Sequence, residues 1–98
     1  MTEVADNPAK HRYEARVDGE LAGWLEYLPA GDSVILAHTE ALREGEGLGG
    51  TLVRGALEAI RASGRAVIPT CPFAAAYIGR HQELVDFVTP SMQSQFRR

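Results

Sequence analysis

The spacing of apolar residues changes at a run of glycines in the middle of the chain, residues 45–50 (GEGLGG). Before this run, apolar and polar residues alternate, which is the period of a half-buried β-strand. After it, Leu48, Leu52, Ala56 and Ile60 recur four apart, which indicates an amphipathic helix of about four turns. The chain must therefore fold into a sheet that comes first and a helix that packs against it.

Two alternating runs, residues 11–17 and 20–28, are separated only by Asp18-Gly19. This dipeptide favours a type I′ turn, because both central positions of that turn need a positive φ. The two runs are therefore predicted to pair as antiparallel strands. After a second turn, residues 33–39 (SVILAHT) form a nearly continuous apolar run, which predicts a central strand.

The second half of the chain carries signals for one more strand and one more helix. Gly64 suits the left-handed position that ends a helix, and residues 65–71 (RAVIPTC) favour a strand. Pro72 is well placed to begin a helix that continues over residues 73–81. The strands at 33–39 and 65–71 should run parallel through a right-handed crossover. The predicted fold class is therefore α/β with a mixed sheet, an antiparallel meander followed by β-α-β-α.

The length of 98 residues is enough for one domain and too short for two. Residues 1–10 show no apolar period and are predicted to be a flexible lead-in. Residues 89–98 (TPSMQSQFRR) are predicted to be a polar tail. The domain is therefore expected to cover residues 11–88.

The net charge of −3 gives no support for binding to nucleic acid or to an anionic membrane. The N-terminus lacks the apolar segment of a secretory signal, and no apolar stretch is long enough to span a bilayer, so we expect a cytoplasmic protein. Residues 1–49 hold four basic and ten acidic side chains, whereas residues 50–98 hold six and three. An anionic ligand should prefer the second half. Cys71 and the three histidines lack metal-binding spacings, so no metal is expected.

A glycine-rich loop at the start of a helix is one way to bind phosphate, because the first N–H groups of the helix are unpaired and carry the positive end of its dipole. Residues 45–50 match the pattern GxGxxG, but the early strand and the later acidic residue of a dinucleotide-binding fold are missing. Two interpretations stay open: a phosphate site, or a tight turn from strand to helix. Glu44 and Glu46 count against the first, because carboxylates repel phosphate.

Several short blocks, taken in order, resemble one family. Residues 44–53 (EGEGLGGTLV) look like the pyrophosphate-binding loop of the Gcn5-related N-acetyltransferases. Residues 38–40 (HTE) and 71–73 (CPF), followed by 76–78 (AYI), resemble the small single-domain branch of that superfamily. The resemblance covers about residues 11–88. It implies transfer of an acetyl group from acetyl-coenzyme A to an amine of a protein or a small molecule, in a ternary complex and without a metal.

The resemblance also implies where the cofactor lies. The loop from Gly47 to Thr51 would hold the pyrophosphate, the strand end would bond the pantetheine arm, and an arginine would neutralise the remaining phosphate. The implied cofactor residues are Thr39, Glu40, Ala41, Gly45, Gly47, Leu48, Gly49, Gly50, Thr51, Arg54, Cys71 and Arg80. In this family two parallel central strands splay to admit the cofactor. Pro69 gives a physical reason, because it lacks an N–H, although it would also fit a sheet edge.

Four residues are candidates for catalysis, each with a structural alternative. Glu40 could take a proton from the amine or be an exposed cap residue, and His38 could act with it, because alternation puts both on the face opposite Thr39. Tyr77 matches, with one residue of slack, the family's tyrosine that protonates the leaving thiolate, or it packs in the core. Cys71 could accept the acetyl group, line the pocket, or be a small buried hydrophobe.

Two other classes of function stay open. The chain could be a coenzyme A-binding sensor or subunit that has lost catalysis, or an interaction domain in which the glycines are structural. The expected partners are acetyl-coenzyme A and an amine acceptor, and the expected state is a monomer or a weak homodimer.

Overall fold

The computed structural model describes residues 1–43 and 47–98. The strands are β1 (Thr2–Asn7), β2 (Arg12–Val17), β3 (Glu20–Ala30), β4 (Ser33–Ala41) and β5 (Ala66–Pro69). The helices are α1 (Leu48–Ala62) and α2 (Pro72–Arg80), with short 3-10 segments η1 (Pro8–Lys10), η2 (Gln82–Phe87) and η3 (Pro90–Gln95). Within the described ranges, no helix has the length and apolar character needed to cross a membrane.

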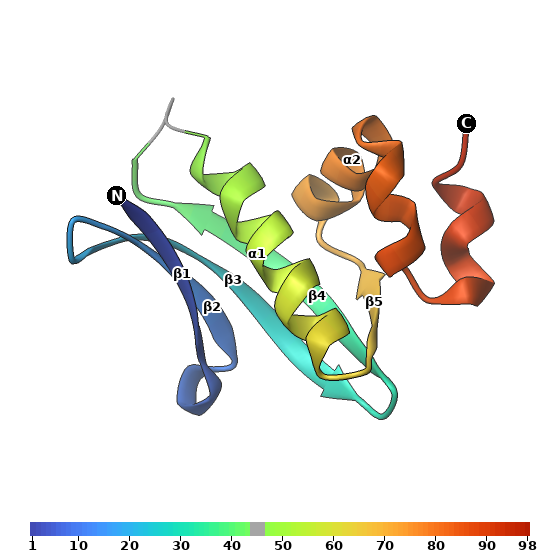
Figure 1. Cartoon of the computed structure of the whole chain (residues 1–98), viewed down its shortest axis with the longest axis horizontal. Helices are drawn as coiled ribbons and strands as arrows, with labels where there is room; N and C mark the ends of the chain where they lie inside the picture. The colour runs from blue at the N-terminus through green and yellow to red at the C-terminus, as the bar shows by residue number, and fades with distance from the viewer. Residues whose placement is uncertain (44–46) are drawn as a thin grey trace.

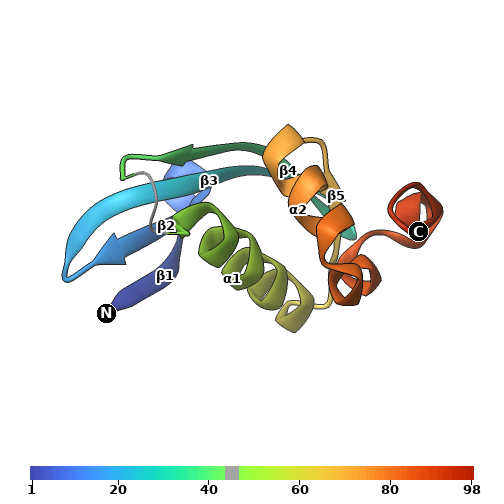
Figure 2. The same cartoon turned by 90° about the horizontal axis from the view of Figure 1, so that it is seen from above.

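One mixed sheet carries the fold, with its strands in the order β1-β2-β3-β4-β5 (Figure 1). The first four strands are antiparallel neighbours, and β5 runs parallel to β4. Helix α1 packs across one face of the curved sheet, and α2 lies beside α1 near β4 and β5 (Figure 2). This architecture confirms the predicted α/β class and the predicted parallel pair.

The turn and cap predictions are confirmed by the backbone angles. Asp18 and Gly19 both have positive φ, 51° and 88°, as a type I′ turn requires. Gly64, with φ 81°, follows the end of α1 in the left-handed region. Pro72 is the first residue of α2. Each of these features depends on residues that are adjacent in sequence.

The prediction of a lead-in at residues 1–10 is wrong for residues 2–7, which form β1. This strand pairs with β2 along its whole length, from Thr2 opposite Val17 to Asn7 opposite Arg12. Val4 packs against α1 at Gly55, where an added Cβ would lie 2.9 Å from Val4 Cγ1. The strand therefore forms because β2 offers an unpaired edge and α1 offers a glycine, and both are distant in sequence.

The predicted polar tail also has structure. Residues 90–95 form η3, and Met92 and Phe96 pack against the core. The Gln82 side chain holds this segment, because its Nε2 donates to the carbonyl of Phe96 at 2.8 Å. Two apolar residues in a polar sequence are enough to dock the C-terminus.

The core lies between α1, α2 and the face of the sheet that they cover. Its largest fully buried side chains are Leu25, Leu36, Leu52, Leu57, Ile60, Ile78, Val53, Val67, Val85 and Val88. The opposite face of the sheet carries polar side chains. There the Glu14 carboxylate accepts from Arg12 Nε (2.8 Å), Asn7 Nδ2 (3.1 Å) and Arg16 Nη2 (3.2 Å). The Arg12 bond, together with the Asn7 and Arg16 bonds, lowers the pKa of Glu14.

Glu14→Gln is expected to reduce the free energy of unfolding at pH 7 by about 1–3 kcal/mol, because it removes a charge that serves three donors and is only 9% exposed. Since the folded-state pKa of Glu14 is below its ordinary value of 4.5, this stabilisation is complete above pH 4.5 and is lost as the pH falls through the folded-state pKa. Urea unfolding at several pH values measures the difference. Glu20→Gln, in an exposed pair with Arg43, is the control and should change stability by less than about 0.5 kcal/mol. Equal losses in both variants would contradict this account.

Candidate functional site

A cleft of about 300 Å³ lies where β4 ends and α1 begins. In Figure 1 these two ends lie on the same side of the molecule. The cleft is lined by Thr39, Ala41, Arg43, Gly47, Leu48, Gly49, Gly50 and Phe73. Six of these residues were predicted from the sequence as cofactor ligands. The predicted ligand Gly45 lies outside the described residues.

Helix α1 begins without a capping side chain. Its N-cap residue, Gly47, has φ +68° and makes no side-chain cap hydrogen bond. The first bond inside the helix runs from Thr51 N to Gly47 O at 3.2 Å, so the N–H groups of residues 48–50 precede the regular ladder. No residue within 1–43 and 47–98 comes within 4 Å of the position that a Cβ on Gly47 would take. The positive end of α1 is therefore open toward the cleft.

The other two glycines have a second, structural role. A Cβ on Gly49 would lie 2.5 Å from Phe73 Cζ, and a Cβ on Gly50 would lie 3.1 Å from Tyr77 Oη. These glycines thus let two aromatic rings of α2 approach the backbone of α1. Gly49 and Gly50 thus serve helix packing, whereas Gly47 leaves the backbone at the start of α1 bare.

A β-bulge in β4 sets the direction of the side chains near the cleft. Tyr27 pairs with Leu36 and Glu26 pairs with His38, so Ala37 is an extra residue in β4. Leu36, before the bulge, faces the core. Thr39, after it, faces the same side as Leu36, although alternation alone would put it on the other. The bulge therefore brings Thr39 and Ala41 to the cleft.

Strands β4 and β5 part immediately after Leu36. The last pair in their register is Leu36 with Pro69, and the N–H groups of Thr70 and Cys71 both bond to the Leu36 carbonyl, at 3.1 and 2.8 Å. Residues 37–41 of β4 thus have no partner in β5. Pro69 is the point where the hydrogen-bond ladder between β4 and β5 stops, and β5 is an edge strand of the sheet. The incomplete ladder and the edge position, which the sequence offered as alternatives for Pro69, therefore occur together.

His38 and Glu40 lie together on the face opposite Thr39, as alternation predicted. His38 Nε2 is 3.1 Å from Glu40 Oε1, and the two side chains are 55% and 48% exposed. Across β3, Glu40 pairs with Trp24 and His38 pairs with Glu26, and Trp24 Nε1 donates to Glu26 Oε2 at 2.9 Å. The pair therefore belongs to a polar surface on the sheet face that α1 does not cover.

Comparison with known families matches residues 12–87 to a family described as GCN5-related N-acetyl-transferase. The match covers most of the chain and includes every residue that lines the cleft. The chain belongs to this family.

A solved structure supports the fold of this acetyltransferase-family domain. It is the NMR solution structure of a GCN5-like protein from Staphylococcus aureus, itself only proposed to be an N-acetyltransferase. The two chains are 18% identical, the similarity covers 89% of this chain and 87% of the other, and the TM-score is 0.69. A comparison with curated protein sequences gives no significant match.

Cys71 of this family member is the N-cap residue of α2 and lies beside the parted strands. Its side chain is 2% exposed, and its Sγ lies 3.3 Å from Thr39 Oγ1. The thiol thus links the start of α2 to the end of β4. Such burial is what the packing interpretation of Cys71 requires.

Tyr77 lies at the contact between α1 and α2. Its hydroxyl accepts from Arg54 Nε at 2.9 Å, and its ring stacks on His81 with centroids 4.0 Å apart. Arg54 also donates from Nη2 to Glu83 at 2.9 Å. The bond to Glu83 raises the pKa of Arg54 most, and the bond to Tyr77 raises it further. The predicted phosphate partner Arg54 is therefore already paired. Arg80, the other predicted partner, is exposed at the end of α2 and does not line the cleft.

Two lining residues were not predicted from the sequence. Arg43 supplies a cation beside the open helix end, and its Nη2 also donates to Glu20 at 3.0 Å. Its position next to the glycine run could have indicated it. Phe73 is 42% exposed and rests on Gly49. Phe73 belongs to the CPF block of the resemblance, but its place in the cleft depends on how α2 packs. Among the described residues, no cluster of three or more metal-binding side chains is present.

Proposed function

We propose that this protein transfers an acetyl group from acetyl-coenzyme A to an amine. The observation that carries the proposal is the open N-terminus of α1 facing a cleft beside parted strands, in a chain of the GCN5-related N-acetyltransferase family. The residues present fit the cofactor, because Gly47 leaves bare backbone where a side chain would obstruct a phosphate. When bound, the cofactor would supply a thioester that an amine can attack.

The phosphate end of the cofactor would lie at the first turn of α1. The N–H groups of residues 48–50 are donors without a partner in the helical ladder, and the helix dipole adds positive potential there. Arg43 adds a full charge on the opposite wall of the cleft. The Thr51 hydroxyl donates to Gly47 O at 3.2 Å, so its part is to fix the turn.

The arm of the cofactor would run along β4. Residues 37–41 lack a partner in β5, so their backbone groups on that edge can bond the amides of an extended ligand. This edge leads from Ala41 at the cleft toward the bulge at Ala37. The gap between β4 and β5 would then open a path from the cleft to the face that carries His38 and Glu40.

Proton transfer would be the task of His38 and Glu40. An amine acceptor is mostly protonated at neutral pH, so a base must remove a proton before the amine can attack. Glu40, hydrogen-bonded to His38, lies on an exposed surface that an acceptor could reach. We assign Tyr77 as the candidate acid for the leaving thiolate, with Arg54 holding its hydroxyl.

Acetyl-coenzyme A at 100 times its dissociation constant should stabilise the protein by about 2.7 kcal/mol and raise the melting temperature by about 10–20 °C. The ligand binds only the folded state, and the chain is small. Differential scanning calorimetry measures the shift, with inorganic pyrophosphate at the same concentration as the control for general anion effects. No shift with the coenzyme would remove both the acetyltransferase proposal and the coenzyme A-sensor alternative. A shift without acetylation of any amine in an acceptor screen would favour the sensor.

Cys71→Ala is expected to keep turnover within about tenfold of the wild type, because a thiol that is buried and bonded to Thr39 is poorly placed to attack a thioester. Steady-state kinetics with an amine acceptor measures this. Mass spectrometry of the wild type without acceptor tests the opposite case. An acetylated Cys71 in that experiment, together with an inactive Cys71→Ala variant, would establish covalent transfer.

A further inference from the structure

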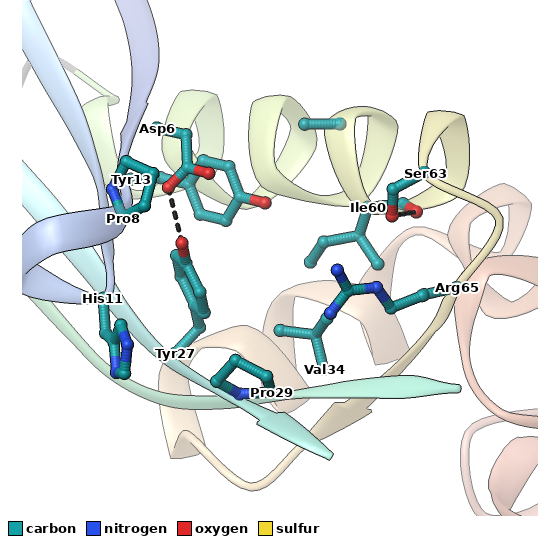
Figure 3. Close-up of a pocket in the computed structure, with 11 residues that line it drawn as sticks. Asp6, Pro8, His11, Tyr13, Tyr27, Pro29, Val34, Ile60, Ser63 and Arg65 are labelled. Carbon is teal, nitrogen blue, oxygen red and sulfur yellow. Dashed lines mark hydrogen bonds between the residues drawn. The ribbon is translucent and has the colours of Figure 1, made fainter. Parts of the chain in front are cut away.

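A second pocket, of about 340 Å³, lies at the opposite end of α1 from the cleft. It is bounded by the end of β1, the start of β2, the C-terminal part of β3 and the last turn of α1 (Figure 3). Since α1 has 15 residues, the two sites are separated by about 20 Å along the helix axis. The proposed acetyl transfer makes no use of this pocket.

The floor of the pocket is aromatic. The rings of Tyr13 and Tyr27 lie with centroids 4.9 Å apart at an angle of 41°, and the two residues are only 6% and 8% exposed. Val34 and Ile60 add apolar wall. His11 stacks on Tyr27 at 5.9 Å, and its φ of 50° is unusual for a residue other than glycine. The floor thus offers a mainly apolar surface of two tilted rings that the fold holds in place.

A carboxylate lies on one side of this floor. The Tyr27 hydroxyl donates to Asp6 Oδ1 at 2.7 Å, which fixes the carboxylate beside the ring (Figure 3). Burial, then the hydrogen bond to Asp6, raises the pKa of Tyr27, so this hydroxyl keeps its proton and continues to donate. The second oxygen of Asp6 remains available to a ligand, because within residues 1–43 and 47–98 it has no side-chain partner.

A guanidinium approaches from the other side. In Figure 3, Arg65 lies on the side of the pocket opposite Asp6, and its guanidinium extends inward beside Ile60 and Val34. No side-chain hydrogen bond or ion pair of Arg65 occurs among the described residues. Burial is the largest cause that raises the pKa of Tyr13 and the pKa of Tyr27. The negative charge of Asp6 raises these two pKa values further, and the positive charge of Arg65 lowers them. The two charges of opposite sign therefore act on the same pair of rings.

The hydroxyl of Tyr13 is a polar group that the fold leaves to the pocket. Tyr13 is more than nine-tenths buried, yet its hydroxyl has no hydrogen-bond partner in the described part of the chain. No fully buried side-chain polar atom there lacks a partner, so this hydroxyl must reach the open space of the pocket. Figure 3 shows it pointing away from Asp6. A ligand on the floor can therefore accept or donate one further hydrogen bond.

We propose that this pocket binds a small zwitterion of the ω-amino acid class, with its ammonium at Asp6, its carboxylate at Arg65 and its methylene chain across the two tyrosine rings. A ligand with one charge would always meet a like charge on one side of the pocket. A ligand with both charges, separated by an apolar chain, meets an opposite charge at each end and buries its methylenes on the floor.

The test is an NMR titration of the ¹⁵N-labelled protein with three matched compounds: 6-aminohexanoate, hexylamine and hexanoate. The expected result is saturable shifts of amides around Tyr13, Tyr27 and Arg65 with 6-aminohexanoate, and affinities at least about tenfold weaker for the two singly charged compounds. Equal affinity for all three compounds would overturn the proposal, as would the absence of saturable shifts with 6-aminohexanoate.

Two variants locate the charges on the ligand. Asp6→Asn should weaken the affinity for 6-aminohexanoate by at least about tenfold, to that for hexanoate. Arg65→Gln should weaken it by at least about tenfold, to that for hexylamine. Glu58→Gln and Arg98→Gln make the same charge changes at exposed positions outside the pocket and should leave all affinities unchanged. If Asp6→Asn and Arg65→Gln are folded and bind 6-aminohexanoate as the wild type does, the proposal is wrong. Tyr13→Phe keeps the ring and removes the hydroxyl, so its affinity for 6-aminohexanoate measures what the hydroxyl contributes to binding.

Discussion

Glu40→Gln is expected to lower turnover by about 10²–10⁴-fold and to leave the dissociation constant of coenzyme A nearly unchanged. The amide cannot accept a proton from the amine, whereas it fills nearly the same space as the carboxylate. The cofactor should bind normally, because the Glu40 side chain lies on the sheet face opposite the one that Thr39 presents to the cleft. Steady-state kinetics and calorimetric titration measure the two quantities.

Glu26→Gln is the matched control for this experiment. Glu26 lies on the same face, directly opposite His38 in the pairing of β3 with β4, and its carboxylate accepts from Trp24 Nε1. It should keep turnover within a few fold of the wild type. If Glu40→Gln turns over like the wild type, the base is His38 or a water molecule. A His38→Gln variant separates the two: it loses activity and changes the pH profile of kcat/KM if His38 is the base, and keeps its activity if water is.

Gly47→Val should weaken coenzyme A binding by at least about 100-fold, which corresponds to the loss of one or two charge-assisted hydrogen bonds. A side chain at Gly47 would project into space that no described residue fills, beside the first N–H groups of α1. The left-handed φ of +68° also makes a non-glycine residue cost about 1–2 kcal/mol of stability or more. Calorimetric titration and urea unfolding measure the two effects.

Gly31→Val separates the two effects. Gly31 has nearly the same backbone, φ +64°, with nothing within 4 Å of its Cβ position, but it lies in the turn between β3 and β4. Its valine variant should lose similar stability and retain full affinity. Normal affinity in a folded Gly47→Val protein would mean that the glycine run serves only the turn and the helix contact. Gly49 is unsuitable for this test, because a side chain there would displace the ring of Phe73.

The parts of the fold that sequence alone predicted depend on neighbouring residues. The dipeptide Asp18-Gly19 favours a type I′ turn by itself, and Pro72 by itself favours the first position of a helix. β1 could not be predicted, because Val4 pairs with a strand and packs on a glycine that are both remote in sequence. Met92 and Phe96 dock the C-terminal segment for the same kind of reason.

The candidate site shows the same division. Alternation was sufficient to place His38 and Glu40 together, since they are two residues apart in one strand. The contact of Cys71 with Thr39 was not predicted, because it joins two segments that meet only after folding. A glycine in a sequence indicates that no side chain fits, but not what fills the space. At Gly49 and Gly50 the occupants are aromatic rings, as only the packed helices reveal.

The single extra residue in β4 gives the sheet two chemically different sides. Before Ala37 the strand directs Leu36 into the interior, and after Ala37 it directs Thr39 inward and the ionisable pair outward. A regular strand that kept Ala37 would exchange those sides, so that His38 and Glu40 would face α1 and Thr39 would face solvent, whereas deleting Ala37 would remove the bulge and leave both sides as they are. Ala37 is exposed, so its side chain is free to vary. Evolution can therefore replace this residue readily, or lose it together with the bulge, but it cannot straighten the strand at its present length without turning the ionisable pair inward.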